Sequence, residues 1–471
     1  AGETINVTGG IFNDAVAEAY CAEGYIPTKN ADGTYGVANA VVKVGNKIYA
    51  SLAEAIKNAQ AGETIEFLAD INGNVTINKS VIIDGNGKTY TGTMTLNKDL
   101  TVTIQNVNFV NGGIDKPKAQ KSTTGTYTIK NCTFDGEGTY AYPVRFYGAK
   151  DVIIEGCTVK NYVYSFLYIV SGTNSVSVQN VTVENCPNYA IYFASGVNNA
   201  MIEGLTVKNS NNGIIVNNTA TRYLTIKNCK MENVGTAIKE SGGTNTINCN
   251  VLGVNEFGGA AISEYANVIG AQLGTKVYGS LADAFAAAQD GDTVKLLGNI
   301  TVDSETAMVA DGKNITLDMN GKKITATDNK AANVSYELFY IYGGLTVTGN
   351  GVIELTSTSN DNAWAKSSTI FHNRGGVLTI ENGTFTHLGG TAMAFVVDNS
   401  GNYYGDALTT INGGELTSTY TAIRNRMEQN THGASGKAIL VINGGGTFAP
   451  FTFANLSFSL VVKAVVAAVL V

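Results

Sequence analysis

The sequence predicts an all-β protein built as a parallel β-helix, a solenoid, and a repeat and its apolar columns carry this prediction. Six segments between residues 102 and 231 align without gaps at steps of 25, 25, 24, 24 and 24 residues. A repeat of this period indicates stacked coils. Three columns of the alignment stay apolar at every step: Ile104, Ile129, Ile154, Val178, Ile202, Ile226; Val107, Cys132, Cys157, Val181, Leu205, Cys229; and Phe109, Phe134, Val159, Val183, Val207, Met231.

Each repeat contains short alternating runs of β-branched residues, separated by Asn and Gly. Such runs predict strands joined by tight bends. A repeat of this length leaves no room for a crossover helix, so successive coils are expected to pair in parallel about 4.8 Å apart. One bend position always holds a residue that tolerates positive φ, and its Asn side chains are expected to stack: Asn106, Asn131, Gly156, Asn180, Gly204 and Asn228.

A second strand is expected in each coil, where a small residue precedes a large apolar one. Because side chains alternate along a strand, one set should point inward and the residues that follow it should point outward. The predicted inward set is Val144, Phe166, Ile191, Ile214 and Ile238. The predicted outward set is Arg145, Leu167, Tyr192, Ile215 and Lys239.

The chain contains one motif twice, since residues 51–56 and 60–65 recur 229 residues later as 280–285 and 289–294. Ser51 and Ser280 are predicted N-caps of short helices at about 51–61 and 280–290. Each helix is expected to cover the open end of a coil column. We therefore expect an end-of-module strand and linker over 1–40, a first β-helix over 41–267 and a second, wider and loopier β-helix over 268–471.

The N-terminal segment repeats the bend motif ahead of the first helix. It resembles the last coil of a preceding module, either because a longer array was cut here or because this strand completes the C-terminal end of a neighbouring subunit. The second alternative would give a head-to-tail contact that does not close and so produces filaments. The predicted assembly residues are Val7, Gly9, Gly10 and Phe12, with Asn443 and Phe448 at the other end.

Composition excludes several classes of partner and cofactor. The net charge is −7 and the arginines are scattered, so we expect no nucleic-acid binding. We also expect no metal and no cofactor, since no Cys/His cluster is present. The six cysteines are interpreted mainly as buried thiols, although the spacing of Cys132 and Cys157 also allows a bridge. The apolar tail 451–471 has the length of a bilayer span, but alternation within it favours a final strand, and membrane contact is not expected.

No catalytic motif is apparent. The outward acids of the repeats alternate with lysines, which is typical of a solvated, cross-strand paired face. The second β-helix holds the polar set His372, Arg374, His387 and His432, with Glu428 and Asp398. These residues are interpreted as scattered loop residues rather than a catalytic site, and no catalytic residue is assigned.

Tyrosines give the strongest functional signal. Several fall on bends or outward positions of consecutive coils, where they could stack on sugar rings or anchor a protein interface. The alternative is that they only cover exposed strand edges. The predicted ligand-binding residues are Tyr147, Tyr162, Tyr164, Tyr189 and Tyr192, with Tyr142 and Tyr223 nearby.

Nearly the whole chain resembles the pectate-lyase-like right-handed parallel β-helix modules of large secreted and surface proteins from gut anaerobes, chiefly Firmicutes. The helix motif at 51–65, the linker 19–35 and the bends at 380–385 carry the resemblance. It implies two tandem modules and a non-catalytic structural or adhesive role on a bacterial cell surface. Partners would be other copies, neighbouring surface modules or glycans. The alternative is a carbohydrate-active β-helix enzyme, a polysaccharide lyase or hydrolase.

Overall fold

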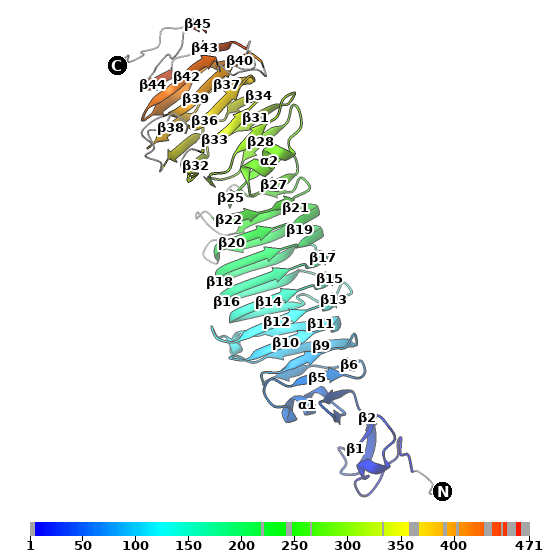
Figure 1. The fold of residues 1–471 in the computed structure, drawn as a ribbon. Helices are drawn as coiled ribbons and strands as arrows, with labels where there is room; N and C mark the ends of the chain where they lie inside the picture. The colour runs from blue at the N-terminus through cyan, green and yellow to red at the C-terminus, as the bar shows by residue number, and fades with distance from the viewer. Residues whose placement is uncertain are drawn as a thin grey trace. The chain divides into compact units, whose positions relative to one another are not determined.

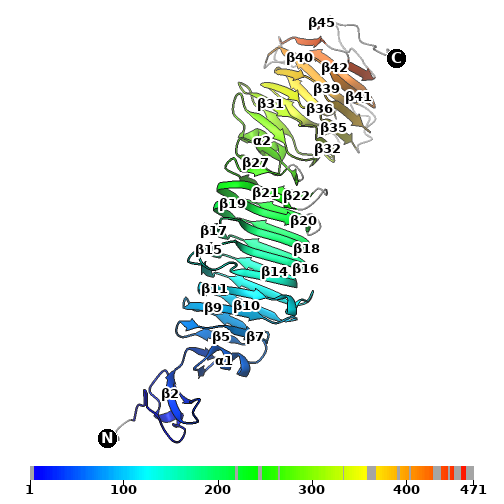
Figure 2. The same ribbon diagram turned by 180° about the vertical axis from the view of Figure 1, so that it is seen from behind.

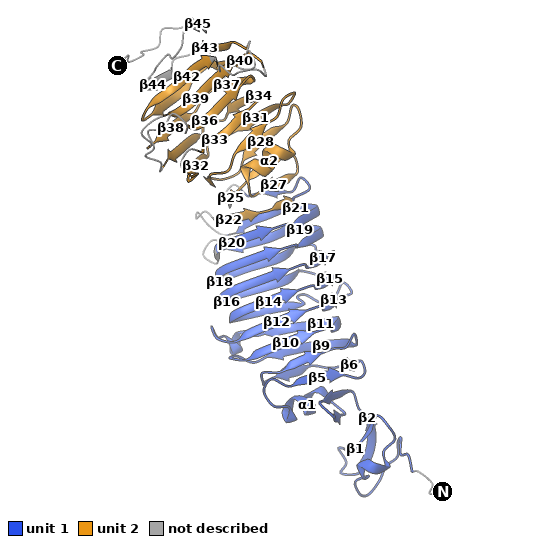
Figure 3. Ribbon diagram, in the orientation of Figure 1, with its two compact units in different colours: residues 1–249, 256–266 blue, residues 250–255, 267–471 orange. Residues whose placement is uncertain are grey.

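The computed structural model describes residues 5–217, 221–241, 247–263, 266–331, 334–357, 367–389, 393–401, 405–427, 436–443, 446–449 and 458–462. The chain divides into two compact units (Figure 3). Unit 1 comprises residues 1–249 and 256–266, and unit 2 comprises residues 250–255 and 267–471.

Unit 1 is a stack of parallel coils (Figures 1 and 2). An antiparallel pair, β1 (Tyr25–Lys29) and β2 (Tyr35–Asn39), precedes it, followed by β3 (Val42–Val44) and β4 (Lys47–Tyr49). Its long strands are β9 (Thr89–Leu96), β11 (Asn108–Lys116), β14 (Val144–Glu155), β16 (Ser165–Gln179), β18 (Tyr189–Glu203), β19 (Thr206–Asn217), β20 (Thr221–Lys227) and β21 (Lys230–Ser241). Shorter strands complete the coils: β5 (Thr64–Phe67), β6 (Ile71–Asn72), β7 (Val75–Ile77), β8 (Ile82–Asp84), β10 (Thr101–Gln105), β12 (Thr126–Lys130), β13 (Thr133–Asp135), β15 (Thr158–Lys160) and β17 (Thr182–Glu184).

The strand register confirms the parallel β-helix. Ile104 pairs with Ile129, and the column continues through Ile154, Val178, Ile202 and Ile226 in the order of the sequence alignment. The column that begins at Phe109 follows the same pairing down to Met231. Members of both columns are fully buried, so apolar side chains fill the interior of the coils.

The bends also behave as predicted. Asn106, Asn131, Asn180 and Asn228 have φ between 52° and 56°, and glycine occupies the same position as Gly156 and Gly204. A second bend carries a ladder of side-chain amides, in which each Asn Nδ2 donates to the Asn Oδ1 of the coil before it, at 3.3, 2.9 and 2.9 Å: Asn161, Asn185, Asn209 and Asn233. Stacked amides therefore connect the coils at these bends.

The inward assignment of Phe166 and outward assignment of Leu167 were wrong. Val144 pairs with Leu167, and Leu167 pairs with Ile191, so Leu167 is the inward residue and Tyr168 the outward one. Phe166 is fully buried as well, immediately before this column. The sequence pattern alone did not separate two adjacent buried residues.

A short helix stands near the beginning of each unit. These are α1 (Leu52–Asn58) and α2 (Leu281–Ala287), which end earlier than the sequence predicted. Ser51 and Ser280 accept a hydrogen bond from the main-chain N–H three residues on, at 3.2 and 3.1 Å, as N-caps do. Each helix buries its apolar side, with Leu52 and Ile56 in α1 and Leu281 and Phe285 in α2.

Unit 2 is also built of parallel coils, each with three strands. Their first strands are β28 (Thr293–Leu296), β31 (Asn314–Asp318), β34 (Gly344–Thr348), β37 (Val377–Ile380), β40 (Ala407–Ile411) and β43 (Ala438–Ile442). The second are β29 (Ile300–Asp303), β32 (Lys323–Asp328), β35 (Val352–Ser357), β38 (Thr384–Leu388), β41 (Gly414–Ser418) and β44 (Gly446–Ala449). The third are β30 (Ala307–Val309), β33 (Tyr336–Ile341), β36 (Ser368–Arg374), β39 (Ala394–Gly401) and β42 (Thr421–Met427).

The coils of unit 2 are longer than those of unit 1. Paired core residues Leu317, Val347, Ile380, Ile411 and Ile442 follow one another at steps of 30, 33, 31 and 31 residues. The tail interpretation is supported over β45 (Phe458–Val462), which pairs in parallel with β43. In the part of the chain that the structure describes, no helix combines the length and apolar composition needed to cross a bilayer.

The cysteines are free thiols, and all except Cys21 are buried. Cys132, Cys157 and Cys229 lie in the predicted inward column, where each thiol is within 3.3 to 3.9 Å of main-chain carbonyl oxygens. Burial raises the pKa of Cys186 and of Cys229 to about 11. Both features lower reactivity, because the thiolate is the reactive form.

The thiols provide a test of this packing. A water-soluble disulfide reagent at neutral pH is expected to label one of the six cysteines rapidly, Cys21, and to label the other five only on unfolding. Peptide mapping of the labelled sites would identify them. Rapid labelling of Cys132 or Cys157 in the native protein would contradict the buried column.

The amide ladder gives a second prediction. Asn209→Ala removes two inter-coil hydrogen bonds and forces alanine into φ 56°, so we expect a loss of about 2 kcal/mol in the free energy of unfolding. Asn209→Gly keeps the backbone freedom and should lose about half as much. Chemical denaturation would measure both, and equal losses would mean that the left-handed backbone contributes nothing.

Candidate functional site

An outward column of unit 1 runs beside the buried core. Strand pairing places Thr95, Asp115, Arg145, Tyr168, Tyr192, Ile215 and Lys239 side by side on seven consecutive coils. The column changes from polar, through an ion pair, to aromatic, and then to Ile215 and a lysine. Its middle coils contain the candidate site.

Five tyrosines form a continuous aromatic patch there, which we name the tyrosine surface: Tyr142, Tyr164, Tyr168, Tyr189 and Tyr192. Tyr142 stacks on Tyr164 with ring centroids 5.5 Å apart and also contacts Tyr168 at 5.3 Å. Tyr168 contacts Tyr192 at 5.4 Å, and Tyr192 meets Tyr189 edge to face at 5.2 Å. Tyr164 is 46% exposed and the other four are half-buried. The rings therefore support one another and still present area to solvent.

The phenol groups of this surface stay protonated at neutral pH. Burial, followed by neighbouring tyrosines, raises the pKa of Tyr168 and of Tyr189 above the ordinary tyrosine value. A protonated phenol both donates and accepts hydrogen bonds. The surface thus combines apolar ring area with hydroxyl groups of both kinds.

An ion pair borders the tyrosine surface on the preceding coils. Arg145 Nε donates to Asp115 Oδ1 at 2.8 Å and Arg145 Nη2 donates to Oδ2 at 2.9 Å, a bidentate arrangement. This pairing raises the pKa of Arg145. The guanidinium carbon also lies 6.0 Å from the centre of the Tyr147 ring. Neighbouring groups therefore hold the arginine in one orientation.

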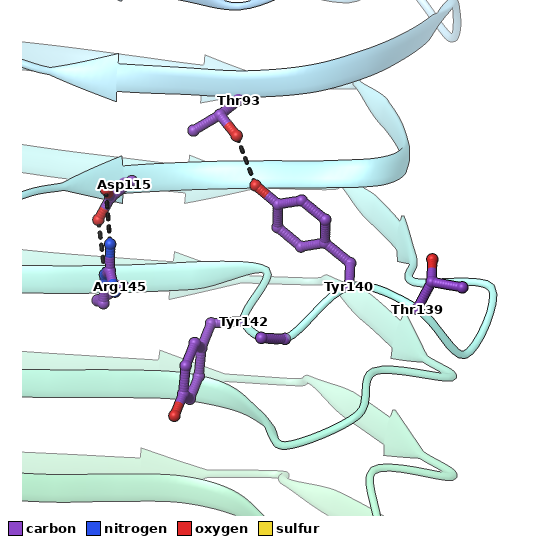
Figure 4. A pocket seen from close by; sticks show the side chains of 7 residues that line it. Thr93, Asp115, Thr139, Tyr140, Tyr142 and Arg145 are labelled. Carbon is purple, nitrogen blue, oxygen red and sulfur yellow. Dashed lines mark hydrogen bonds and ion pairs between the residues drawn. The ribbon is translucent and has the colours of Figure 1, made fainter.

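A pocket lies against this ion pair (Figure 4). Its volume is about 260 Å³, and it is lined by Thr93, Asp115, Thr139, Tyr140, Ala141, Tyr142 and Arg145. Figure 4 shows Tyr140 reaching toward the coil above, where its hydroxyl lies 2.5 Å from Thr93 Oγ1. Tyr142 belongs to both features, so the pocket and the tyrosine surface are continuous.

Four of the five predicted ligand-binding tyrosines lie at or beside this site. Tyr164, Tyr189 and Tyr192 belong to the tyrosine surface, and Tyr147 flanks Arg145. The prediction for Tyr162 was wrong, because that ring is only 1% exposed and its hydroxyl donates to the Gly112 carbonyl at 2.9 Å. Its pKa is raised by burial, as expected for a core residue.

Sequence reasoning missed Tyr168 and the pocket. Tyr168 was lost with the register error at Leu167, although the paired residues Val144, Leu167, Ile191, Ile214 and Ile238 recur at nearly uniform steps of 23, 24, 23 and 24. That uniform spacing was the available signal. Of the other tyrosines, Tyr223 is 62% exposed and faces Asn199, in the half of β18 that is far from Tyr189.

The predicted assembly residues lie in paired strands. Val7 forms a parallel bridge with Cys21, and both main-chain polar groups of Phe12 are hydrogen-bonded to Tyr35. Gly9 and Gly10 lie between these contacts. At the other end, the Asn443 side chain donates to Asn412 Oδ1 at 2.9 Å, and Phe448 pairs with Leu416. A donated strand at Val7 to Phe12 would first have to leave its partners within the chain.

The polar residues of unit 2 separate into two groups. His372 Nε2 lies 3.2 Å from Ser400 Oγ and 3.6 Å from Asp398 Oδ2, while His372 Nδ1 lies 3.6 Å from Glu337. Arg374 donates to the Tyr340 hydroxyl at 2.5 Å. His387 is buried on a different strand, where burial lowers its pKa to about 4. Glu428 and His432 lie outside the described residues.

Asp398 is the centre of the first group. Its carboxylate is fully buried and accepts from Arg424 Nε at 2.9 Å and from Arg426 at 3.1 and 3.2 Å. Burial by itself would raise the pKa of Asp398, but Arg424, His372 and Arg426 outweigh it and hold the pKa well below its usual range. A carboxylate neutralised in this way cannot act as a general acid. Among the described residues no group of His, Cys, Asp or Glu is arranged to hold a metal ion.

Comparison with known families finds one match. The family model described as "Right handed beta helix region" matches residues 120–282, which include the whole tyrosine surface. The comparison with curated proteins finds no match. The family match supports the parallel β-helix part of the sequence resemblance.

The buried carboxylate gives a prediction for unit 2. Asp398→Asn is expected to lower the free energy of unfolding by about 3–5 kcal/mol at neutral pH, because it leaves two arginines beside an uncharged group. Since the pKa is lowered in the folded state, this contribution is present above the unfolded value near pH 4 and is lost as pH falls below it.

Denaturation curves of both proteins across acidic and neutral pH would measure the difference. Asp311→Asn, at an exposed position of the same unit, is the matched control and should change stability little. A difference between wild type and Asp398→Asn that grew on acidification would contradict the assigned charge state.

Proposed function

We propose that this protein is a non-catalytic, extracellular adhesive β-helix of a bacterial surface, and that it binds carbohydrate chains on the tyrosine surface. The observation that carries the proposal is the continuous set of five tyrosine rings on three consecutive coils of unit 1. The right-handed β-helix match is consistent with it.

The geometry of the rings favours an extended ligand. Coils of a parallel β-helix are about 4.8 Å apart, and ring contacts continue from Tyr142 through Tyr168 to Tyr192. Aromatic rings offer flat apolar area for the apolar faces of sugars, and they lose little conformational entropy on binding because they are already packed against one another. A chain that runs across the coils would meet a ring on each of them.

The charges near the surface favour binding over hydrolysis. Glycoside hydrolysis by the usual routes requires two accessible carboxyl groups on either side of the bond, one of which must be protonated. Asp115 is instead held by both oxygens in a bidentate pair with Arg145. Asp398 of unit 2 is fully buried between arginines. Neither carboxylate is placed to exchange a proton with a substrate.

Filament formation through the N-terminal strand is not part of this proposal. Val7 and Phe12 are paired with Cys21 and Tyr35 of the same chain. At the C-terminal end, β43 is paired with β45 along its length. End-to-end addition through these segments would have to replace existing pairs.

The proposal predicts that truncating the central rings removes binding. The double variant Tyr168→Ala/Tyr192→Ala should lose about 10- to 100-fold in affinity for any polysaccharide that wild type binds, since buried aromatic anchors dominate such interfaces. The measurement is a polysaccharide panel followed by calorimetric titration. Tyr223→Ala is the matched control, because Tyr223 is exposed in the same unit but lies outside the tyrosine surface.

Two results would contradict the proposal. One is a wild-type protein that binds no glycan in the panel, as expected if the tyrosine surface docks a protein. The other is catalytic release of reducing ends or unsaturated products from a bound glycan, with loss of that release on mutating His372 or Arg374. The second outcome would favour the enzyme alternative.

A further inference from the structure

We propose that the pocket beside the tyrosine surface is a subsite for one neutral sugar residue, and that the Asp115–Arg145 pair selects this residue against acidic sugars. This inference rests on the proposed carbohydrate binding and adds to it the chemical class of the ligand. It places specificity on the ion pair and leaves most of the affinity to the rings.

The size of the pocket suits a single ring. Its volume is about 260 Å³, a little below the range of about 300–1,000 Å³ that encloses drug-sized ligands. One wall is the Tyr142 ring, which is also stacked on Tyr164. A sugar in the pocket would therefore be continuous with residues of the same chain that lie on the tyrosine surface.

The polar atoms that line the pocket match neighbouring sugar hydroxyls. Arg145 uses Nε and Nη2 on Asp115, and its Nη1 carries two further N–H donors. Each Asp115 oxygen retains a second lone pair. A hydroxyl can donate to the carboxylate while its neighbour accepts from the guanidinium. The Tyr140 hydroxyl and Thr139 Oγ1 line the same pocket and provide groups that both donate and accept.

The charge balance disfavours an acidic sugar. A uronate or sulfate in the pocket would lie beside the Asp115 carboxylate, while the positive charge of Arg145 is already paired. Both partners are only partly exposed, with side-chain exposures of 36% for Arg145 and 21% for Asp115, so repulsion there is screened less than at a free surface. The net charge of −7 acts in the same direction over longer distances.

The register of the strands connects the subsite to the chain-binding surface. Arg145 pairs with Tyr168 on the next coil, and Asp115 pairs with Arg145 on the coil before. In Figure 4, Asp115 and Arg145 lie on neighbouring coils beside Tyr142. A chain that follows the tyrosines toward Asp115 reaches the pocket within one coil.

The test compares neutral oligosaccharides with counterparts of the same length that carry one uronate residue. Calorimetric titration would be run on wild type, Asp115→Asn and Ala141→Leu, which fills the pocket without touching the ion pair. Glu203→Gln is the matched control, because Glu203 pairs with Lys227 at the other end of β18 and is also partly exposed. Tyr168→Ala reports on the tyrosine surface, and thermal unfolding confirms that each variant is folded.

We expect wild type to prefer the neutral member of a pair by at least 10-fold. Asp115→Asn should lose most of this preference, Ala141→Leu should bind the neutral ligand about 10-fold more weakly, and Glu203→Gln should match wild type. Equal binding by wild type, Asp115→Asn and Ala141→Leu, with loss only in Tyr168→Ala, would overturn the subsite and leave the proposed function standing. Preference of wild type for the acidic member would also overturn it. Absence of binding to every neutral and acidic ligand would overturn both.

Discussion

The structure of each unit depends on parallel strands that pair in register from coil to coil. Because side chains alternate along a strand, a fixed register sends one set of residues inward on every coil and the neighbouring set outward. The inward column from Ile104 to Ile226 is fully apolar for this reason, and Asn or Gly at the adjoining bends adopts the positive φ that closes the turn. A slip of one residue in any coil would bury the outward set and expose the core. The register therefore fixes the surface as strictly as it fixes the interior.

The same constraint explains why one face can acquire a function without disturbing the fold. Outward residues at equivalent positions on successive coils are neighbours in space, although they are more than 20 residues apart in sequence. Asp115 and Arg145 become a bidentate pair in this way, and Tyr168 and Tyr192 become ring partners. None of these side chains is required by the core, so their identities are free to differ from coil to coil. A solenoid can thus assemble an extended binding surface by substitutions at single outward positions.

Much of the fold could be predicted from the sequence because the core repeats its chemistry as well as its period. The apolar columns, the Asn and Gly bends and the buried thiols all followed from that regularity. The candidate site could be predicted only in part. Tyr168 was missed because Phe166 and Leu167 are both buried, so hydrophobicity could not fix the register between them. Tyr162 was misplaced because an aromatic residue after a bend can turn inward when a main-chain acceptor, here the Gly112 carbonyl, satisfies its hydroxyl. The pocket draws on residues from Thr93 to Arg145, and no local pattern announces such a combination.

The two charged clusters of the chain differ in a way that bears on function. In unit 2, Asp398 is fully buried and is surrounded by Arg424, Arg426 and His372, so every strong acceptor position is used within the protein. In unit 1, the Asp115–Arg145 pair has the same bidentate geometry but lies half-open beside a pocket and a row of aromatic rings. A buried ion pair contributes mainly to fixing one arrangement of the strands, since its desolvation offsets much of its attraction. A partly exposed pair keeps unused donors and acceptors in a defined orientation. Ligand recognition requires groups of that kind, and for this reason the binding surface is assigned to unit 1.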